Sequence, residues 1–223
     1  MKRKKLVIFG KGVNAQLAYE YFTHDSGYDI VAFCVDKDYL NEKEMLSLPV
    51  EDFEDIEKKY SPAEHAFFVA VGETALNRFR ASICKRAKEK GYKLASYISS
   101  KASVWHNVRI GENCFILGDC ILQPFAKIGN NVIAWHGTNV GHHSRIGDNC
   151  FLATADISGL CEIGKNCFIG ARALIADGIK IAKDNYIAMG AVVSKDTTEN
   201  SIYRGNPAKK ASISAKFFCG LEE

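Results

Sequence analysis

An aliphatic residue recurs at every sixth position through the second half of the chain, and this spacing constrains the fold more than any other feature. The series loses one residue after its ninth member and holds Ile, Leu or Val at fifteen of its sixteen positions. An α-helix needs a period near 3.6 and a half-buried strand a period of two, so a strict period of six fits neither. The sixteen positions are Val104, Ile110, Ile116, Leu122, Ile128, Ala134, Val140, Ile146, Leu152, Ile157, Ile163, Ile169, Ile175, Ile181, Ile187 and Val193.

The residues between these positions are typical of tight corners. The motif Ile-Gly-x-Asn begins at Ile110 and recurs at spacings of 18, 18 and 17 residues. Glycine and asparagine adopt positive φ at low cost, which suits a corner between two short strands. Three hexads then form one three-sided turn with its aliphatic residues pointing inward, and the series makes about five turns. The sequence predicts a hexapeptide-repeat parallel β-helix.

The first half of the chain has a different pattern. Apolar, β-prone runs at 4–10, 29–36, 66–72 and 92–98 predict four strands, and helical stretches follow at 11–22, 51–60 and 73–91. Strands that alternate with helices predict a parallel sheet with right-handed crossovers. We therefore expect a short Rossmann-like α/β domain over residues 1–98, followed by a β-helix domain with a C-terminal tail over residues 99–223.

Composition narrows the class of protein. The 29 Lys and Arg residues nearly balance the 26 Asp and Glu residues and are dispersed, which argues against a nucleic-acid partner. The apolar run after the basic N-terminus stops at Gly10, too early for a signal peptide, and no run suits membrane insertion. The eight cysteines form no CxxC pair and occupy apolar positions, which predicts reduced, buried thiols and no metal site. A cytoplasmic location is expected.

The repeat, the turn at His142, the stretch GAVVSKD (190–196) and the closing GNPAK (205–209) resemble the left-handed β-helix sugar acyltransferases. With the α/β domain in front, the chain is similar to sialic-acid O-acetyltransferases and to enzymes that N-acetylate nucleotide-linked 4-amino-sugars. The resemblance covers nearly the whole chain. It implies a left-handed coil, a homotrimer with sites between subunits, acetyl-CoA as co-substrate without a metal, and a role in lipopolysaccharide or other surface glycan biosynthesis.

His142 is the predicted general base. The resemblance places a histidine before Ile-Gly at this turn, in the groove between subunits. An acetyl thioester is attacked by a neutral amine, and an imidazole with a pKa near about 6.5 is suited to accept the amine proton. A backbone N–H from a neighbouring turn would stabilise the oxyanion, and neither Cys150 nor Ser144 is needed as a nucleophile.

Three positions near His142 depart from the family pattern. Relatives often carry an acidic residue at the position of His143, a second histidine at the position of Phe151 and an asparagine at the position of Trp135. The proton acceptor is therefore retained while its surroundings differ. His143, which we include in the predicted catalytic site, either orients His142 or is a bystander.

The resemblance also implies where acetyl-CoA binds. The pantetheine arm would lie along the later turns, beside small residues that let it approach the backbone. Basic side chains near the C-terminus would meet the phosphates of the cofactor, or would form only a solvated basic tail. The predicted positions are Gly159, Ala171 and Gly190 for the arm, and Lys195, Arg204, Lys209 and Lys210 for the phosphates.

In the α/β domain, GKGVNA (10–15) forms a Gly-x-Gly-x-x-Ala turn between a strand and a helix, where a helix N-terminus can hold a phosphate. This turn alone would also fit NAD, but four short strands leave no second mononucleotide half. The resemblance implies that the domain holds the nucleotide of a sugar substrate, although a purely structural domain is the alternative. The matching positions are Gly12, Asn14, Asp36 and Gly72.

Three functions remain open from the sequence. The first is an acetyl-CoA-dependent N-acetyltransferase acting on a nucleotide-activated amino-sugar. The second is a sugar O-acetyltransferase, for example on sialic acid. The third is a non-catalytic or zinc-binding β-helix protein, for which His106, His136 and His142 share one hexad position. His106 lies two turns from His142, so we do not expect the three to converge.

Overall fold

The structure is a computed structural model in which residues 3–221 are described, and the chain divides into two compact units. One unit runs through Gly72 and includes Arg80–Tyr97. The other comprises Glu73–Phe79 together with the chain from Ile98 onward. The short segment 73–79 thus belongs with the C-terminal unit, although it lies in the first half of the sequence.

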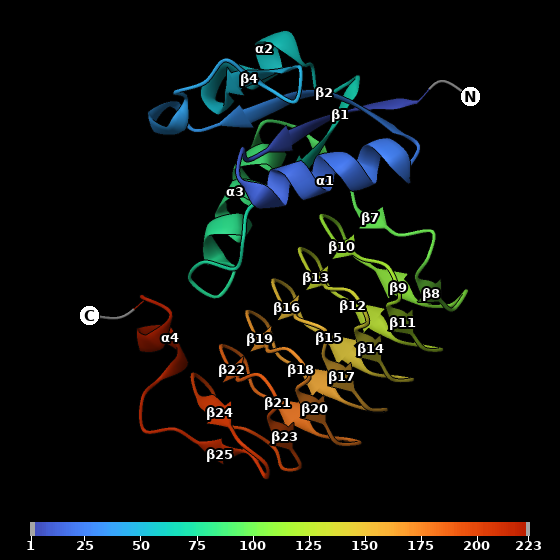
Figure 1. Cartoon of the computed structure of the whole chain (residues 1–223), viewed down its shortest axis with the longest axis vertical. Coiled ribbons are helices and arrows are strands. Elements are labelled where there is room, and N and C mark those ends of the chain that lie inside the picture. Colours follow the sequence, from blue (N-terminus) through green and yellow to red (C-terminus); the bar gives the residue numbers. More distant parts are fainter. Residues whose placement is uncertain (1–2, 222–223) are drawn as a thin grey trace. The chain divides into compact units, whose positions relative to one another are not determined.

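The N-terminal unit is built on a mixed sheet with the strand order β3-β4-β2-β1-β5-β6. The central strand β1 pairs in parallel with β2 and β5, so that Phe9 lies opposite both Cys34 and Val69. The carboxyl ends of these three strands therefore meet at one edge of the sheet (Figure 1). The elements are β1 (Lys4–Phe9), α1 (Val13–His24), β2 (Tyr28–Val35), η1 (Lys37–Tyr39), β3 (Glu44–Met45), β4 (Leu48–Asp52), η2 (Phe53–Asp55), α2 (Ile56–Lys59), β5 (His65–Val69), α3 (Arg78–Glu89) and β6 (Lys93–Leu94).

The sheet of the N-terminal unit has more strands than the sequence predicted. Among the described residues its sheet has six strands where four were predicted, because β3 and β4 form a hairpin whose second strand pairs with β2. The expected helix at 51–60 is reduced to α2, since pairing with β2 keeps the start of that stretch extended. The expected helix at 73–91 begins only at Arg78, after three residues with positive φ.

The C-terminal unit is a left-handed parallel β-helix, as predicted. Each of the sixteen hexad positions is the second residue of one strand, and each strand pairs with the strand one turn away. The strands are β8 (Ser103–Val104), β9 (Arg109–Ile110), β10 (Phe115–Ile116), β11 (Ile121–Leu122), β12 (Lys127–Ile128), β13 (Ile133–Ala134), β14 (Asn139–Val140), β15 (Arg145–Ile146), β16 (Phe151–Leu152), β17 (Asp156–Ile157), β18 (Glu162–Ile163), β19 (Phe168–Ile169), β20 (Leu174–Ile175), β21 (Lys180–Ile181), β22 (Tyr186–Ile187) and β23 (Val192–Val193); β7 (Tyr97–Ile98) precedes them.

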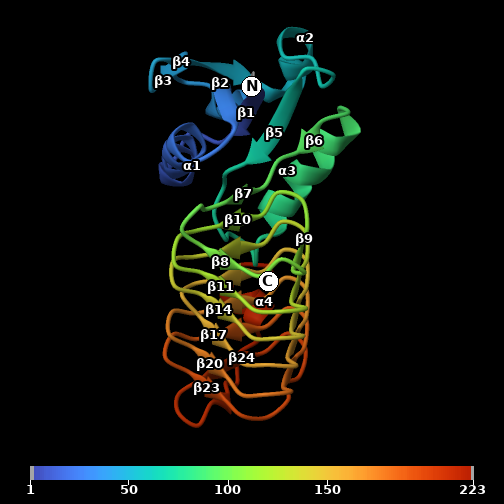
Figure 2. The same cartoon turned by 90° about the vertical axis from the view of Figure 1, so that its right-hand side faces the viewer.

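These strands form three faces (Figures 1 and 2). Face one holds β7, β10, β13, β16, β19 and β22; face two holds β8, β11, β14, β17, β20 and β23; face three holds β9, β12, β15, β18 and β21. The residue missing after Leu152 is absorbed at the corner between β16 and β17, where Thr154 adopts a φ of 54°. Strand pairing continues across this corner without a break, because Asp156 still pairs with Asn139.

The interior of the coil is apolar. The inward aliphatic residues pack with Cys114, Cys120, Cys150, Cys161 and Cys167, all of them buried. Burial raises the pKa of the Cys120 thiol to about 11, so this thiol is neutral and packs as a small apolar group. Ser144 is also internal: its Oγ donates to the Ser158 carbonyl at 2.8 Å and accepts from the Cys161 N–H at 2.9 Å.

The corner between faces three and one carries one residue type in turn after turn, and we call it the asparagine corner. Its members all have positive φ, between 52° and 60°, and each amide Nδ2 donates to the Oδ1 one turn on, at 2.9–3.0 Å. This ladder satisfies polar groups that would otherwise be buried unpaired. The corner consists of Asn113, Asn131, Asn149, Asn166 and Asp184.

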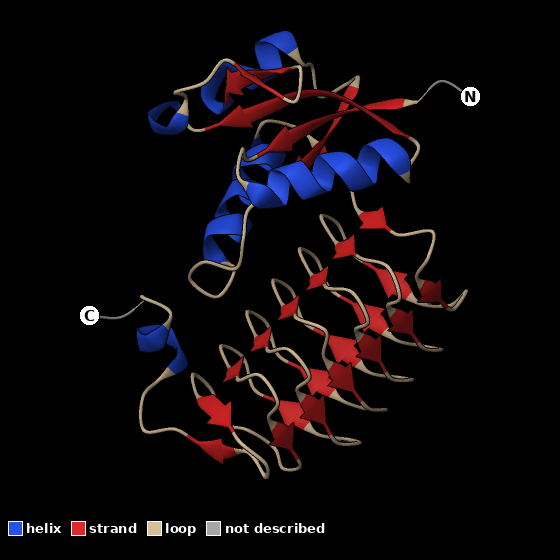
Figure 3. Cartoon of the chain, viewed as in Figure 1, coloured by secondary structure: helices blue, strands red, loops and turns tan. Residues whose placement is uncertain are grey.

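The chain closes with an arm packed on face one. Strand β24 (Ile202–Arg204) pairs with β22, β25 (Lys209–Lys210) turns back on β24, and the short helix α4 (Ala215–Phe218) follows. Figure 3 shows that the C-terminal unit otherwise consists of short strands and loops. Across residues 3–221, no helix combines the length and apolar character that crossing a membrane requires.

Candidate functional site

His142 lies on the corner between faces two and three, which we call the histidine corner. The corner is formed in successive turns by 105–108, 123–126, 141–144, 158–161 and 176–179, between the strands of those two faces. The side chains of His142 and His143 are exposed, so both imidazoles lie outside the coil. His142 therefore presents an exposed imidazole on a rigid scaffold.

Gly159 lies one turn on and directly against the imidazole of His142. A Cβ added to Gly159 would lie 2.7 Å from both Cε1 and Nε2 of His142, and 3.2 Å from Oδ1 of Asp177. The absence of a side chain therefore creates the space in which the ring rests. Gly159 is buried, and its N–H donates to no atom among the described residues. Buried N–H groups without an acceptor are rare in folded proteins.

His143 contacts the other side of the imidazole. The two Nδ1 atoms are 3.3 Å apart, a distance at which one ring donates and the other accepts. His143 has a φ of 59° and stacks on Phe125, with ring centroids 4.6 Å apart and an angle of 27° between the planes. This contact engages Nδ1 of His142 and leaves Nε2, on the side of Gly159, without a hydrogen-bond partner among the described residues.

A chain of amides runs from His142 across face two. The His142 N–H donates to Oε1 of Gln123 at 3.1 Å, Gln123 Nε2 donates to Asn139 at 3.2 Å, and Asn139 Nδ2 donates to Asp156 at 2.8 Å. These bonds fix the side chains beside a hollow of about 210 Å³. The hollow is lined by Gly137, Asn139, Thr154, Ala155, Asp156, Arg172 and Leu174.

The residues predicted to contact acetyl-CoA are spread over the later turns and the arm. Ala171 and Gly190 stack at the corner between faces one and two, where the Gly190 N–H donates to the Ala171 carbonyl at 2.9 Å. Gly159 belongs to the histidine corner, on the other side of face two. The side chains of Lys195, Arg204, Lys209 and Lys210 are all exposed.

In the N-terminal unit, three of the four predicted residues lie close together. Gly12 precedes α1, and the amide of Asn14 packs against Gly72, where an added Cβ would lie 3.1 Å from Asn14 Nδ2. Asp36 follows β2 at the same edge of the sheet. Its carboxylate pairs with the guanidinium of Arg86 at 2.7 and 3.2 Å. Asp36 is thus held by a basic side chain that the sequence analysis did not single out.

The other two histidines of the β-helix, and two of the three altered family positions, lie away from the imidazole of His142. His136 is on the corner between faces one and two, whereas His106 shares the histidine corner with His142 two turns away. Trp135, at the corner between faces one and two, stacks on Phe151 of face one, with ring centroids 6.1 Å apart. Within residues 3–221, no three His, Cys, Asp or Glu side chains are grouped so that they could hold a metal ion.

Sequence reasoning missed Gln123 and Arg86. Gln123 precedes Gly141 by 18 residues, and that register would have placed it one turn below the His142 corner. Arg86 is one of several basic residues in α3, and no local pattern distinguishes it from Lys85 or Lys88. The contact with Asp36 depends on how α3 packs.

Comparison with known proteins agrees with this architecture. A histidine-to-asparagine mutant of perosamine N-acetyltransferase from Caulobacter crescentus, in a complex with CoA and GDP-perosamine, superposes with a TM-score of 0.85 and 26% identity over 94% of this chain and 97% of that one. The acetyltransferase domain of PglB from Neisseria gonorrhoeae superposes with a TM-score of 0.84 and 25% identity over 94% and 100% of the two chains.

Among curated sequences, the putative acetyltransferase YJL218W of Saccharomyces cerevisiae is 33% identical over 106 residues, which is 46% of this chain and 54% of that protein. The chain spans about half or less of the length of the curated relatives it matches. The solved structures therefore match this chain over more of its length than the curated sequences do.

The fold and the histidine corner define a hexapeptide-repeat left-handed β-helix protein of the architecture found in these acetyltransferases, so the resemblance predicted from the sequence is confirmed. The family model described as "DCTN5: Dynactin subunit 5" matches residues 98–210, just over half of the chain, and the chain belongs to that family. The match lies almost wholly within the β-helix unit.

Proposed function

We propose that the protein transfers the acetyl group of acetyl-CoA to the amine of a nucleotide-linked sugar, with His142 as the general base. The observation that carries the proposal is the pairing of an exposed imidazole with the uncommitted N–H of Gly159 beside it. Acyl transfer needs a proton acceptor and an oxyanion donor close together, and the histidine corner offers both.

In the proposed reaction, the sugar amine attacks the carbonyl carbon of the thioester. His142 accepts the amine proton at Nε2, which requires the tautomer in which its Nδ1 is the donor in the contact with Nδ1 of His143. The Gly159 N–H donates to the oxyanion of the tetrahedral intermediate. The C–S bond then breaks, the CoA thiolate takes up the proton held by His142, and the N-acetylated sugar is released. His143 is assigned the role of orienting His142, since the two Nδ1 atoms are 3.3 Å apart.

The nucleotide-sugar is assigned to residues 1–98, which the sequence predicted as the nucleotide-binding domain. The N-terminus of α1 supports this assignment. Gly12 provides no side-chain cap and the first turn contains no acidic residue, so the partial positive charge of the helix N-terminus is available to a phosphate. Gly12, Asn14 and Gly72 would surround the phosphates, and Asp36, held by Arg86, would accept from a ribose hydroxyl or the base. A neighbour at 26% identity was crystallised with GDP-perosamine.

Acetyl-CoA is assigned to the β-helix. Its arm would pass Gly159, Ala171 and Gly190, and its phosphates would meet Lys195, Arg204, Lys209 and Lys210. Small residues and exposed cations at these positions are compatible with this path, and structures of two neighbours contain CoA or acetyl-CoA. We further assign a homotrimer with sites between subunits, a cytoplasmic location and a role in surface glycan synthesis.

The test uses purified protein with acetyl-CoA and a panel of GDP- and UDP-linked amino-sugars. Release of free thiol and a product heavier by one acetyl group are expected, and the product should resist mild alkali, which cleaves an O-acetyl ester but not an amide. An alkali-labile product would instead indicate the O-acetyltransferase. No thiol release with any amino-sugar or sialic acid would reject both.

A further inference from the structure

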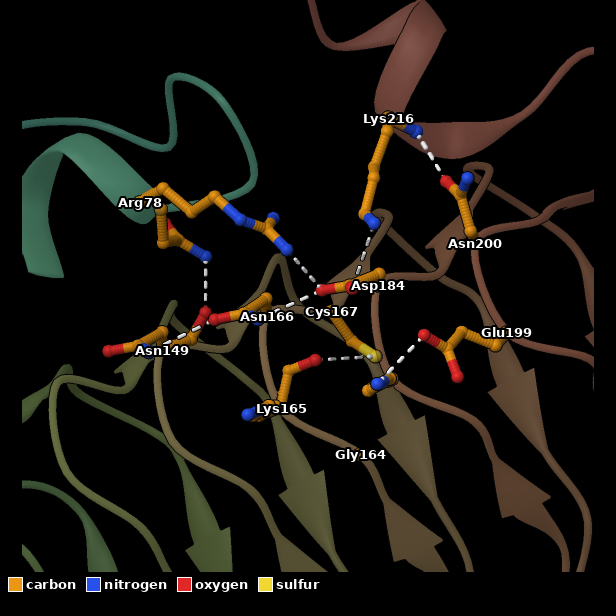
Figure 4. Close-up of polar contacts among 12 residues, drawn as sticks. Arg78, Asn149, Gly164, Lys165, Asn166, Cys167, Asp184, Glu199, Asn200 and Lys216 are labelled. Atoms are coloured by element: carbon orange, nitrogen blue, oxygen red, sulfur yellow. Dashed lines mark hydrogen bonds and ion pairs between the residues drawn. The ribbon is translucent and has the colours of Figure 1, made fainter. Parts of the chain in front are cut away.

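The asparagine corner ends in a charged residue, and the side chains around it are shown in Figure 4. Four turns carry asparagine, but the fifth carries Asp184, whose Oδ1 accepts from Asn166 Nδ2 at 2.9 Å. An amide would complete the ladder equally well at this point. The replacement of an amide by a carboxylate in a residue only 4% exposed therefore calls for a cation, because a buried charge without a partner is strongly unfavourable.

Two cations, from segments far apart in the sequence, reach Asp184 (Figure 4). The Arg78 guanidinium lies 2.6 Å from Oδ1, and the Lys216 ammonium lies 3.7 Å from Oδ2. Arg78 belongs to segment 73–79, which the chain enters directly from Gly72. Lys216 belongs to α4 in the C-terminal arm. One buried carboxylate thus joins both segments to the coil.

Segment 73–79 is held in an unfavourable conformation. Ala75, Leu76 and Asn77 have φ values of 54°, 49° and 62°, a region that L-residues avoid. The Oδ1 of Asn77 and the Nη1 of Arg78 are buried without a hydrogen-bond partner in the part of the chain that the structure describes. Leu76 is buried, and Asn77 Nδ2 donates to the Asn149 carbonyl at 2.7 Å. Backbone strain of this kind is concentrated at functional segments.

The C-terminal arm is anchored at the same corner. The Lys216 N–H donates to Oδ1 of Asn200, which continues the row of positive φ residues one turn beyond Asp184. The ring of Phe218 packs against Tyr186, with centroids 5.1 Å apart. Upstream in the same arm, β25 carries Lys209 and Lys210.

We propose that Asp184 is a positioning residue for both substrates. This inference rests on the proposed function. Through Arg78, Asp184 holds the segment that continues from Gly72, where the nucleotide-sugar is assigned. Through Lys216, it holds the arm that carries the lysines assigned to the CoA phosphates. Asp184 touches neither substrate and acts on binding through these two segments.

The test distinguishes the contact of Asp184 with Arg78 from its contact with Lys216. Arg78→Gln removes one ion pair and should raise KM for the nucleotide-sugar about tenfold without changing the Kd of CoA. Lys216→Gln should raise the Kd of CoA and leave KM for the nucleotide-sugar unchanged. Asp184→Asn keeps an acceptor for Asn166 and should raise both constants, while kcat stays within about twofold of wild type, as expected for a loss of uniform binding.

The matched control is Lys183→Gln. Its exposed partner Glu199 is 2.9 Å away, and among the described residues no side-chain hydrogen bond or ion pair joins either residue to segment 73–79 or to α4, so both constants should match wild type. If all variants lower the melting temperature but leave both constants unchanged, Asp184 is only structural and the inference is overturned. If Asp184→Asn does not fold, the constants measured for Arg78→Gln and Lys216→Gln decide whether the inference holds. Wild-type protein that binds neither substrate would overturn the proposed function itself, whereas active wild type with unaltered variants overturns only the role of Asp184.

Discussion

The asparagine corner and the histidine corner belong to the same coil, but they differ in how strictly they repeat. The first carries Asn or Asp in five successive turns, hydrogen-bonded from turn to turn. The second carries His106, Pro124, His142, Gly159 and Asp177 at equivalent positions, which is four residue types in five turns. A corner that supports the coil repeats one residue type, as Asn113, Asn131, Asn149 and Asn166 do, whereas the chemistry that we propose at the histidine corner needs particular side chains at particular turns. Variation within a repeat therefore locates the site.

The largest expected effect is the loss of turnover in His142→Asn. General-base catalysis contributes about 10²- to 10⁴-fold, so we expect a fall of about a thousandfold in kcat with an unchanged melting temperature. Thiol release from acetyl-CoA measures the rate. His136→Asn, which alters the same hexad position at another corner, should keep wild-type turnover. A folded His142→Asn protein with normal kcat would remove the general base from the proposal.

Substitutions at the asparagine corner should lower the stability of the protein and leave its turnover unchanged, the reverse of what we expect for His142→Asn. Asn149→Ala removes bonds to Asn131 and Asn166 and forces alanine to the φ of 60°. We expect a loss of about 2–4 kcal/mol in the free energy of unfolding by urea, with kcat unchanged in folded protein.

Asn149→Gly is the matched control for this loss. It removes the same hydrogen bonds but not the freedom to adopt positive φ, so it should recover about 1 kcal/mol. Equal stability of Asn149→Ala and wild type would contradict a structural role for the ladder.

Gly159→Ala tests the contact between the two turns of the histidine corner. The new methyl group would overlap Cε1 and Nε2 of His142 and turn the ring away, so kcat should fall about 10- to 100-fold through misplacement of the base. Gly27→Ala is the control, because an added Cβ there meets no atom within 4 Å. Full activity in Gly159→Ala would mean that the resting position of the ring is not the working one.

His143 should have a smaller effect than His142. Asparagine tolerates the positive φ of this position but cannot reproduce the contact between the two Nδ1 atoms, so His143→Asn should lower kcat about tenfold. His143→Asp supplies a carboxylate acceptor and should retain more activity. Equal, wild-type rates in both variants would identify His143 as a bystander.

The smallest effect concerns the pH dependence of stability. Burial opposes ionisation of Asp184, but hydrogen bonds from Asn166 and Arg78 outweigh it and hold the pKa of its carboxyl below the usual value. The stabilisation is therefore fully present above the pKa of the unfolded chain, about 3.9, and is lost as pH falls through the lower folded value. Urea unfolding should show a constant gap between wild type and Asp184→Asn above about pH 5, and a narrowing gap below pH 4. A gap that widens on acidification would contradict this sign.

The repeat unit was predictable almost residue by residue, whereas the N-terminal unit was predictable only in outline. Each hexad position contacts its own copy one turn away, so local spacing specifies the tertiary contact. Outside the repeat, β4 of the N-terminal unit and the turn at Ala75–Asn77 have no comparable local signal. Pairing with β2 and burial against the coil decide their conformations.

The candidate site divides in the same way. His142 and the small residue at Gly159 were predictable, since a histidine and a glycine stand out against an aliphatic period. The hydrogen bond that Gln123 accepts from the His142 N–H, the pairing of Asp36 with Arg86 and the position of Trp135 at another corner than His142 were not.

By itself, the sequence determined that an α/β unit is followed along the chain by a three-sided coil. It also determined which corner of the coil carries an exposed imidazole. These results follow from short-range periodicity, in which each residue meets neighbours at a constant sequence separation. Only the tertiary structure decided that Gly159 borders the ring of His142, and that Asp184 joins segments 106 and 32 residues away. Such contacts depend on how the side chains of different elements pack against one another. The separation of these elements along the chain follows no period, so the sequence pattern does not predict the contacts.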